Sequence, residues 1–287
     1  MIAMTDDMLQ HLYKLVLEAY RREVTDHPEK RDIRVGASST QADVDFERAI
    51  ADAGRTVLGN SLVVIGEEAV SAGQWADITS DLVLLVDPID GTRLFREAAP
   101  GFATTFTVLE RGRVVGGCIL LPQSGDTLLC GADGRILLRS DAAAERRPTT
   151  VAVRRSDGPE AESLARRFED EGFITERLGS SARRLFDIAS GRCAGLVKKV
   201  AVEHGVPRLW GIATGLSACA AQGAHFWWDP KSRLLAVGGD GLRAVWPKSS
   251  PLRPITYEHL WSSLLGSGSR RRLKGCALLK EPCLESR

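Results

Sequence analysis

The feature of this 287-residue sequence that most limits its fold is a short, wholly apolar run that stops abruptly at acidic residues. Residues 82–86 read Leu-Val-Leu-Leu-Val, and Asp87-Pro88-Ile89-Asp90-Gly91-Thr92 follows at once. A continuous apolar run of this length is typical of a strand that is covered on both faces. The chain is therefore expected to fold in layers, with the acidic turn at the end of a buried strand.

Around that strand, the first half of the sequence predicts hairpins and the second half predicts alternating strands and helices. Arg111-Gly112 and Asp133-Gly134 are turn signals between β-rich runs. After about residue 151, expected strands alternate with expected helices, which indicates an α+β or mixed α/β architecture. We expect an N-terminal α+β half over residues 1–145 that carries the metal site, a C-terminal α/β half over 146–247, and a peripheral or disordered tail over 248–287.

Composition and charge exclude several classes of protein. The 38 Lys and Arg nearly balance the 37 Asp and Glu, giving a net charge of +1 and no electrostatic reason to expect a nucleic-acid or membrane partner. No apolar run reaches the roughly 18 residues of a membrane span. The first residues carry acids where a secretory signal carries bases, so we expect a cytoplasmic protein. The six cysteines form no Cys-x-x-Cys pair and are expected to be reduced thiols.

Acidic residues follow two of the expected strands. Asp87 and Asp90 end the apolar strand, where a turn can bring their carboxylates and the Ile89 carbonyl into one small volume. Glu67 follows a second short strand over residues 62–65. If the two strands are neighbours, the three acids lie close together and repel one another unless a cation compensates. Because Mg²⁺ prefers oxygen ligands, the sequence predicts a magnesium site.

The turn after these acids has features of a phosphate site. Gly91-Thr92 supplies a flexible turn, a hydroxyl and the N–H groups of a possible helix start, which suit a phosphate. Two divalent ions beside such donors make a phosphoryl-transfer site, in which one ion lowers the pKa of a bound water and the other stabilises the leaving oxygen.

These motifs resemble those of the inositol monophosphatase family. The family's paired signature is matched by residues 66–68 (Gly-Glu-Glu) and 87–92 (Asp-Pro-Ile-Asp-Gly-Thr). Residues 40–43 (Thr-Gln-Ala-Asp) resemble its Thr-x-x-Asp segment, and residues 178–182 (Leu-Gly-Ser-Ser-Ala) resemble its Gly-Ser helix start. The resemblance runs in order from about residue 5 to residue 247, which is most of the chain.

The resemblance implies a fold, a cofactor and a set of roles. The implied fold is a layered αβαβα sandwich of the inositol monophosphatase and fructose-bisphosphatase type, usually a homodimer that acts on a small phosphorylated metabolite with Mg²⁺. The implied metal ligands are Glu67, Asp87, Asp90 and the Ile89 carbonyl. The implied catalytic residues are Glu67 together with Asp43 and Thr92, which would orient the attacking water. Substrate contacts are expected from Gly91, Thr92, Arg93 and Glu203, with His204 and Arg208 as further specificity candidates.

One position departs from the family pattern. The family begins a long helix with Trp-Asp, and that Asp holds the second metal ion; the matching residues here are Trp210 and Gly211. Glycine has no side-chain oxygen, so this ligand is missing. A second Trp-Asp pair ends at Asp229, past the helix, and we interpret Asp229 as a turn residue before Pro230. The departure puts catalytic activity in doubt without affecting the fold.

Two functions follow from this pattern. The first is Mg²⁺-dependent hydrolysis of an inositol phosphate, a sugar phosphate or a 3′-phosphonucleotide by a metal-activated water. The second is a non-catalytic or weakly active relative that binds a phosphorylated metabolite or a protein partner. Gly211 favours the second, whereas the retained Glu67, Asp87 and Asp90 favour the first. A nucleic-acid role for the basic tail lacks any interleaving of basic and aromatic residues.

Overall fold

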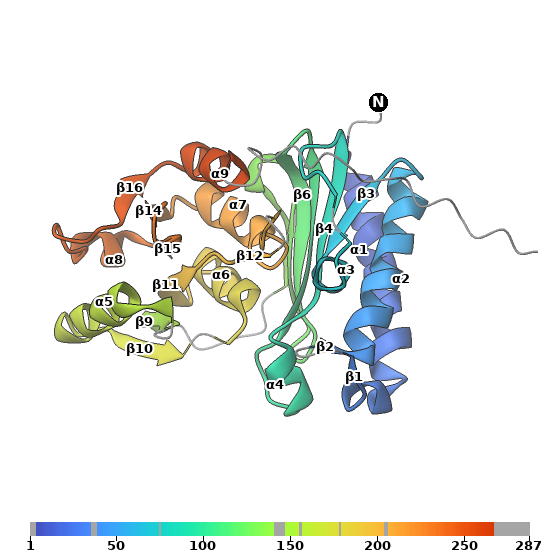
Figure 1. The fold of residues 1–287 in the computed structure, drawn as a ribbon, viewed down its shortest axis with the longest axis horizontal. Helices are drawn as coiled ribbons and strands as arrows, with labels where there is room; N and C mark the ends of the chain where they lie inside the picture. Colours follow the sequence, from blue (N-terminus) through green and yellow to red (C-terminus); the bar gives the residue numbers. More distant parts are fainter. Residues whose placement is uncertain are drawn as a thin grey trace, which may run out of the picture.

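In the computed structural model, residues 4–35, 39–74, 76–140, 147–154, 157–177, 179–203 and 206–266 are described. The chain folds in layers, with helices and sheets alternating across the molecule (Figure 1). Helices α1 and α2 cover one side of a first sheet, α6 and α7 lie between this sheet and a second one, and α5 and α8 cover the far side of the second sheet. This confirms the expected layered α/β sandwich.

The first sheet has six strands in the order β3-β4-β5-β6-β7-β8. Only β3 and β4 pair in parallel, and the other neighbours are antiparallel, as the turn signals predicted. Side chains of β4 enter two separate cores, Leu85 on one face and Leu84 on the other, so the apolar run is covered on both sides. The strands are β3 (Val63–Gly66), β4 (Leu82–Asp90), β5 (Ala103–Glu110), β6 (Arg113–Leu121), β7 (Asp126–Cys130) and β8 (Ile136–Ser140).

The second sheet also has six strands, in the order β10-β9-β11-β15-β14-β16. Strands β10, β9 and β11 are parallel, and the rest pair antiparallel. The strands are β9 (Arg147–Val153), β10 (Ile174–Arg177), β11 (Cys193–Lys199), β14 (His225–Asp229), β15 (Leu234–Gly238) and β16 (Arg253–Ile255). All strands of the first sheet precede residue 141, and all strands of the second sheet follow residue 146. The expected division into an N-terminal and a C-terminal half near residue 145 remains a proposal.

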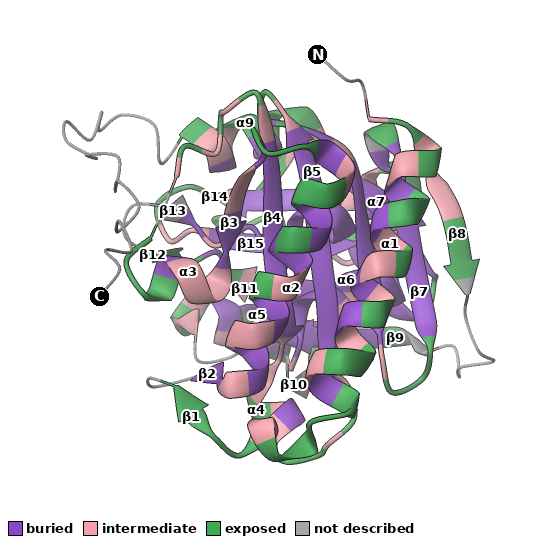
Figure 2. Cartoon of the chain, turned by 90° about the vertical axis from the view of Figure 1, so that its right-hand side faces the viewer, coloured by how far each residue is buried: buried purple, intermediate pink, exposed green. Residues whose placement is uncertain are grey.

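The helices owe their positions to apolar faces that repeat at helical spacing. In α1, Leu9, Leu12 and Val16 are buried against the first sheet, while the outer side of the helix faces solvent (Figure 2). The helices are α1 (Asp6–Tyr20), α2 (Gln41–Leu58), α3 (Glu67–Ser71), α4 (Thr92–Arg96), α5 (Pro159–Asp170), α6 (Ser181–Ala189), α7 (Ala213–Ala221), α8 (Asp240–Ala244) and α9 (Tyr257–Gly266). Short pieces complete the described part: η1 (Arg21–Thr25), η2 (Pro28–Arg31), η3 (Ala132–Gly134), and the pairs β1 (Arg34–Val35) with β2 (Ser39–Thr40) and β12 (Val202–Glu203) with β13 (Val206–Pro207).

The expectation of a peripheral tail from residue 248 is wrong as far as residue 266. Strand β16 pairs with β14, and α9 buries Leu260, Trp261 and Leu264 in the central core. These three apolar residues recur at helical spacing, a pattern that predicts a buried helix face even though the flanking sequence is polar. The rest of the expected tail, residues 267–287, lies outside the described residues.

Two expectations from composition can be compared with the structure. Cys118, Cys130, Cys193 and Cys219 are buried free thiols, while Cys276 and Cys283 lie outside the described residues. Burial raises the pKa of the Cys130 thiol to about 12 and that of Cys193 to about 11. In the part of the chain that the structure describes, no helix is both long and apolar enough to span a membrane.

Candidate active site

The acidic residues predicted from sequence follow two strands that are neighbours. Strands β3 and β4 run in parallel, with Gly66 opposite Val86. Glu67 and Asp87, the next residues on each strand, therefore leave the sheet at the same edge. Glu67 begins α3, whereas β4 continues through Asp87 to Asp90 before Gly91 turns the chain into α4. Parallel pairing is thus what brings the two acidic segments together.

Asp87 is a buried carboxylate without a hydrogen-bond partner for one oxygen. Its side chain is 3% exposed, and its Oδ1 atom receives no hydrogen bond. Burial raises the pKa of Asp87 far above its usual value, and the nearby Asp90, Asp43 and Glu68 raise it further. A buried unpaired carboxylate oxygen is costly, and a divalent cation is the ligand that satisfies it.

Asp90 is held by the beginning of α6. Its Oδ2 atom accepts hydrogen bonds of 2.7 Å from both the Ser180 hydroxyl and the Ala182 backbone N–H. Ser180 is also the N-cap of α6, accepting from the Arg183 N–H at 2.9 Å. One carboxylate oxygen is therefore fixed by the second half of the chain, and the other is left for a different ligand.

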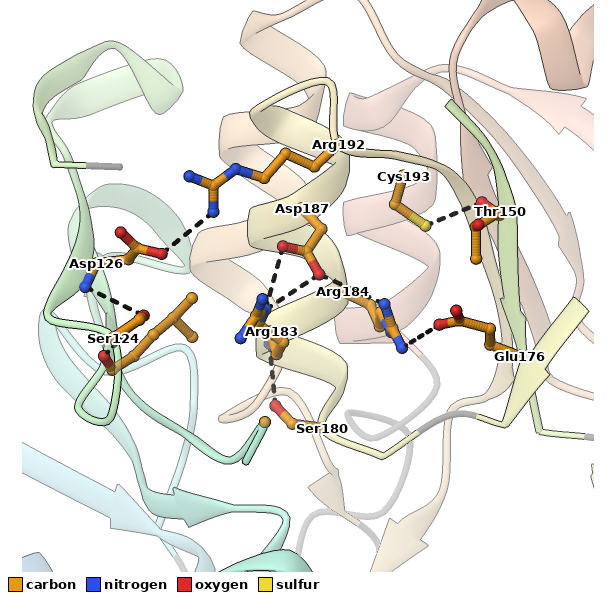
Figure 3. Close-up of polar contacts among 12 residues, drawn as sticks. Ser124, Asp126, Thr150, Glu176, Ser180, Arg183, Arg184, Asp187, Arg192 and Cys193 are labelled. Carbon is orange, nitrogen blue, oxygen red and sulfur yellow. Dashed lines mark hydrogen bonds and ion pairs between the residues drawn. The ribbon is translucent and has the colours of Figure 1, made fainter. Parts of the chain in front are cut away.

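Ion pairs keep α6 in the orientation that this contact requires (Figure 3). Arg183 donates from Nε to both oxygens of Asp187 at 3.1 Å, one turn further along the helix. Arg184 reaches Glu176 on β10 at 2.6 Å. After the helix, Arg192 pairs with Asp126 of the first sheet at 3.2 Å, and both side chains are buried. Because these contacts bind α6 to both sheets, they fix the position of Ser180 beside Asp90.

Asp43 and Thr92, the two residues expected to orient the attacking water, lie in contact. Thr40 caps α2, and its backbone N–H donates to Asp43 Oδ2 at 2.8 Å, completing a capping box. The other oxygen, Asp43 Oδ1, lies 3.2 Å from the Thr92 hydroxyl, which is also 3.2 Å from the Ile89 carbonyl oxygen. Burial raises the pKa of Asp43, and the hydrogen bonds from Thr40 and Thr92 partly offset that rise.

Glu47 is a buried acid of this site that the sequence analysis did not identify. Its carboxylate accepts from the backbone N–H groups of Glu68 at 2.8 Å and Ala69 at 2.9 Å, at the start of α3. Burial raises its pKa to about 7. The available signal was its spacing, because Asp43 and Glu47 are four residues apart and therefore share one face of α2.

Glu67 is paired with an arginine from the other half of the chain. Arg208 donates from Nη2 to Glu67 Oε1, lies 3.7 Å from Glu203, and stacks over the Trp210 ring at 5.5 Å. Glu203 accepts from Ser71 at 3.1 Å and does not line the cavity described below. Glu203 therefore contacts Arg208, which does line that cavity. The other specificity candidate, His204, lies outside the described residues.

Gly211 lies directly against the two aspartates. A Cβ atom on Gly211 would lie 2.8 Å from Asp87 Oδ2 and 3.6 Å from Asp90 Cγ. A side chain at position 211 would thus reach both carboxylates, and Asp87 occupies part of that space. Asp229, in contrast, ends β14 and accepts from the Lys231 and Ser232 N–H groups at 3.1 Å, as a turn residue does.

These residues open into a cavity of about 870 Å³ with a strongly basic wall. Its floor includes Asp87, Asp90, Thr92 and Gly211. Seven basic residues line it: Arg93, Arg96, Arg154, Arg177, Lys198, Lys199 and Arg208. Within the described ranges, Arg96, Arg154 and Arg177 have no ion-pair partner, whereas Arg93 lies 3.5 Å from Glu97. The positive wall suits an anionic ligand.

The donor set fits a magnesium ion at the aspartates. Asp87 provides an unpartnered buried oxygen, Asp90 a free oxygen, and the Ile89 carbonyl a third hard donor. Among the residues described, no three Asp, Glu, His or Cys side chains gather into a closed cluster. Glu67, the expected additional ligand, is instead engaged by Arg208.

Comparison with known sequences assigns this layered fold to a family. The chain belongs to the inositol monophosphatase family, whose model matches residues 5–239. It is 32% identical over 160 residues to a curated relative, the uncharacterized protein y4fL of Sinorhizobium fredii (strain NBRC 101917 / NGR234). That match covers 54% of both proteins, so the chain spans about half the length of this relative.

Solved structures show the same fold at low sequence identity. Inositol monophosphatase-II from Staphylococcus aureus has a TM-score of 0.66 at 16% identity, over 86% of this chain and 94% of that one. The extragenic suppressor protein suhB from Bartonella henselae has a TM-score of 0.61 at 18% identity, over 92% and 99%. The staphylococcal protein has also been solved with inositol monophosphate bound and with 2′AMP bound.

Proposed function

We propose that this protein is a Mg²⁺-dependent phosphatase that hydrolyses a small phosphomonoester with a water as the nucleophile. The observation that carries the proposal is the Asp43–Thr92 contact beside the unpartnered oxygen of buried Asp87. Membership of the inositol monophosphatase family supports the same reaction class. The reaction consumes one water: R–O–PO₃²⁻ + H₂O gives R–OH and HPO₄²⁻.

The metal would be held by Asp87, Asp90 and the Ile89 carbonyl, with Glu67 joining if it leaves Arg208. A divalent ion there supplies a water of lowered pKa and neutralises phosphoryl oxygens. The chain's own contribution is orientation. Asp43 accepts a hydrogen bond from the Thr92 hydroxyl, so that the Thr92 oxygen would be free to accept a hydrogen bond from the attacking water and orient it. The N–H groups of Gly91 and Thr92, at the start of α4, would donate to the phosphate.

The substrate that fits best is a compact and highly anionic phosphate ester. The basic wall, with Arg96, Arg154 and Arg177 unpaired in the described part of the chain, favours an inositol phosphate, a sugar phosphate or a 3′-phosphonucleotide. Of the ligands in the staphylococcal structures, inositol monophosphate belongs to the first of these classes, and 2′AMP is a nucleotide monophosphate. The family resemblance is the reason to propose a homodimer, and the acidic first residues are the reason to propose a cytoplasmic location.

The second candidate is a protein that binds a phosphorylated metabolite or a protein partner with little or no turnover. Two observations favour it: the missing side chain at Gly211 and the engagement of Glu67 by Arg208. Both reduce the number of carboxylates available to bind a metal ion. A protein of this second kind would still bind phosphate esters in the basic cavity.

The test is phosphate release from inositol, sugar and nucleotide monophosphates, with and without Mg²⁺. We expect turnover that requires Mg²⁺, and a fall of about 100-fold or more for Thr92→Val, because that variant keeps the shape but cannot orient a water. Asp90→Asn should also abolish turnover. Asp229→Asn is the matched control and should leave turnover unchanged, because Asp229 lies in a turn outside the cavity. Binding of the same esters without Mg²⁺-dependent turnover would favour the second candidate.

A further inference from the structure

Two parallel strands of the second sheet end in basic residues that line the cavity. Arg154 directly follows β9, and Lys198 is the last residue but one of β11. The two strands are neighbours, with Val153 opposite Val197, and the Arg154 N–H donates to the Val197 carbonyl oxygen at 3.2 Å. Because neighbouring strands lie about 4.8 Å apart, Arg154 and Lys198 leave the sheet side by side.

Both side chains lie on the face of the second sheet that is covered by α6. Leu196, two residues before Lys198, packs in the same core as α6, and side chains two residues apart share a face of a strand. The Lys198 ammonium accordingly donates to the Ser181 hydroxyl, at the start of α6, at 2.6 Å. Ala152, two residues before Arg154, belongs to that core too, so Arg154 lies on the same face as Lys198.

The first residues of α6 lie next to both this pair of cations and the proposed metal site. Ser180 and Ala182 donate to Asp90, whereas Ser181, between them, accepts from Lys198. Among the described residues, no ion pair joins Lys198 to Asp90. An anion bound by Lys198 would therefore lie beside the ends of β9 and β11, whereas the phosphoryl group that is hydrolysed is proposed to lie at the start of α4.

The positive charges of Arg154 and Lys198 are not balanced by a contacting acid. In the part of the chain that the structure describes, neither side chain has an ion-pair partner. Burial lowers the pKa of the Lys198 ammonium and the charge of Arg154 lowers it further, while nearby carboxylates, chiefly Asp90, oppose this change. An anion bound between the two cations would remove their repulsion and accept charge-assisted hydrogen bonds from both.

We propose that Arg154 and Lys198 form a second anion subsite, which binds an anionic group of the ligand other than the phosphoryl group that is hydrolysed. The preferred substrate is then a phosphate ester that carries a second phosphate or a carboxylate. The planar fork of an arginine and the point charge of a lysine both suit such a group. The subsite itself does not depend on turnover, whereas its use by a substrate rests on the proposed function.

The first experiment measures the binding of inorganic phosphate to the full chain by calorimetric titration in the presence of a chelator. Without a divalent ion the buried aspartates repel an anion, so we expect one phosphate per chain, bound by Arg154 and Lys198. Arg154→Met and Lys198→Met should each weaken this binding roughly tenfold or more, because each removes a charge-assisted hydrogen bond. Lys199→Met is the matched control and should change binding much less, since Lys199 lines the same cavity but shares the strand face of Val197, away from α6.

Variants that keep the charge distinguish a loss of charge from a loss of structure. Arg154→Lys and Lys198→Arg should retain most of the binding, and they provide the comparison if a methionine variant does not fold. The subsite would be refuted if the metal-free natural protein bound no phosphate. Equal losses in Lys198→Met and Lys199→Met would also refute it.

The second experiment identifies the group that the subsite selects, in Thr92→Val protein with Mg²⁺ so that the esters stay intact. It compares glucose 1-phosphate with glucose 1,6-bisphosphate and with glucuronate 1-phosphate, which carries a carboxylate in place of the second phosphate. We expect the bisphosphate to bind roughly tenfold more tightly than the monophosphate, and this preference to disappear when Arg154→Met is added. Tight binding of the glucuronate ester as well would support the subsite and show that a carboxylate suffices. Equal binding of all three would overturn its role in substrate selection.

The two proposals fail in different ways. Metal-independent phosphate binding that requires Arg154 and Lys198, without turnover of any ester, would refute the phosphatase proposal and support the subsite. Mg²⁺-dependent turnover without metal-independent phosphate binding would do the reverse.

Discussion

Replacing Gly66 by alanine should separate the Glu47 carboxylate from the start of α3. A Cβ atom on Gly66 would lie 2.1 Å from Glu47 Cδ and 2.4 Å from each of its carboxylate oxygens. The backbone itself is not the obstacle, because φ of Gly66 is −105°, which any residue adopts. The Glu47 carboxylate would have to leave, and the N–H groups of Glu68 and Ala69 would lose their acceptor.

The expected loss of stability follows from those two hydrogen bonds. At pH 8, where the Glu47 carboxylate is charged, each hydrogen bond to it contributes about 1.5–3 kcal/mol, so losing both should lower the free energy of unfolding by about 3–6 kcal/mol. Urea denaturation of the metal-free protein measures this change. Gly241→Ala is the control, because its new Cβ atom in α8 would meet nothing within 4 Å. That variant should be neutral or slightly stabilised, since alanine favours a helix.

A change of less than about 1 kcal/mol in Gly66→Ala would refute the reasoning, because it would mean that α3 does not depend on the Glu47 carboxylate. Phosphate release offers a second readout. Since α3 begins at Glu67, we expect the same variant to lose turnover even under conditions where it remains folded.

Two further predictions concern pH and ligand binding. The pKa of Glu47 is raised by burial from 4.5 to about 7, so the folded state holds its proton more tightly and Glu47 contributes stability at low pH that is lost as pH rises toward 7. Relative to Glu47→Gln, the metal-free natural protein should therefore be less stable at pH 8 than at pH 5, and denaturation curves that shift in parallel would contradict this. For the basic wall, Arg154→Ala combined with Arg177→Ala should raise KM and leave kcat nearly unchanged, because both arginines line the cavity and are proposed to bind the anionic substrate rather than to take part in the chemical step. A loss confined to kcat in steady-state assays would show that the wall acts in the chemical step instead.

The order of the elements and the core of the site follow from local patterns. The apolar run at residues 82–86 predicted a strand covered on both faces, and the structure places its alternate side chains in two cores. Asp43 and Thr92, which lie 49 residues apart, were both identified through short motifs that resemble those of the family, and the structure places them in contact. Such features are readable because each depends on a few neighbouring residues and on the end of one strand.

The sequence alone also determined that no carboxylate stands at position 211, which is a matter of residue identity. Only the tertiary structure decided which charged side chains lie around the two aspartates beside position 211. Arg208 engages Glu67, Glu47 holds the start of α3, and Lys198 of the second sheet lines the same cavity as the aspartates. These partners are separated by up to 141 residues, as in the pair of Glu67 and Arg208. Long-range electrostatic contacts depend on how the two sheets pack against α6 and α7, and no local pattern in the chain encodes that packing.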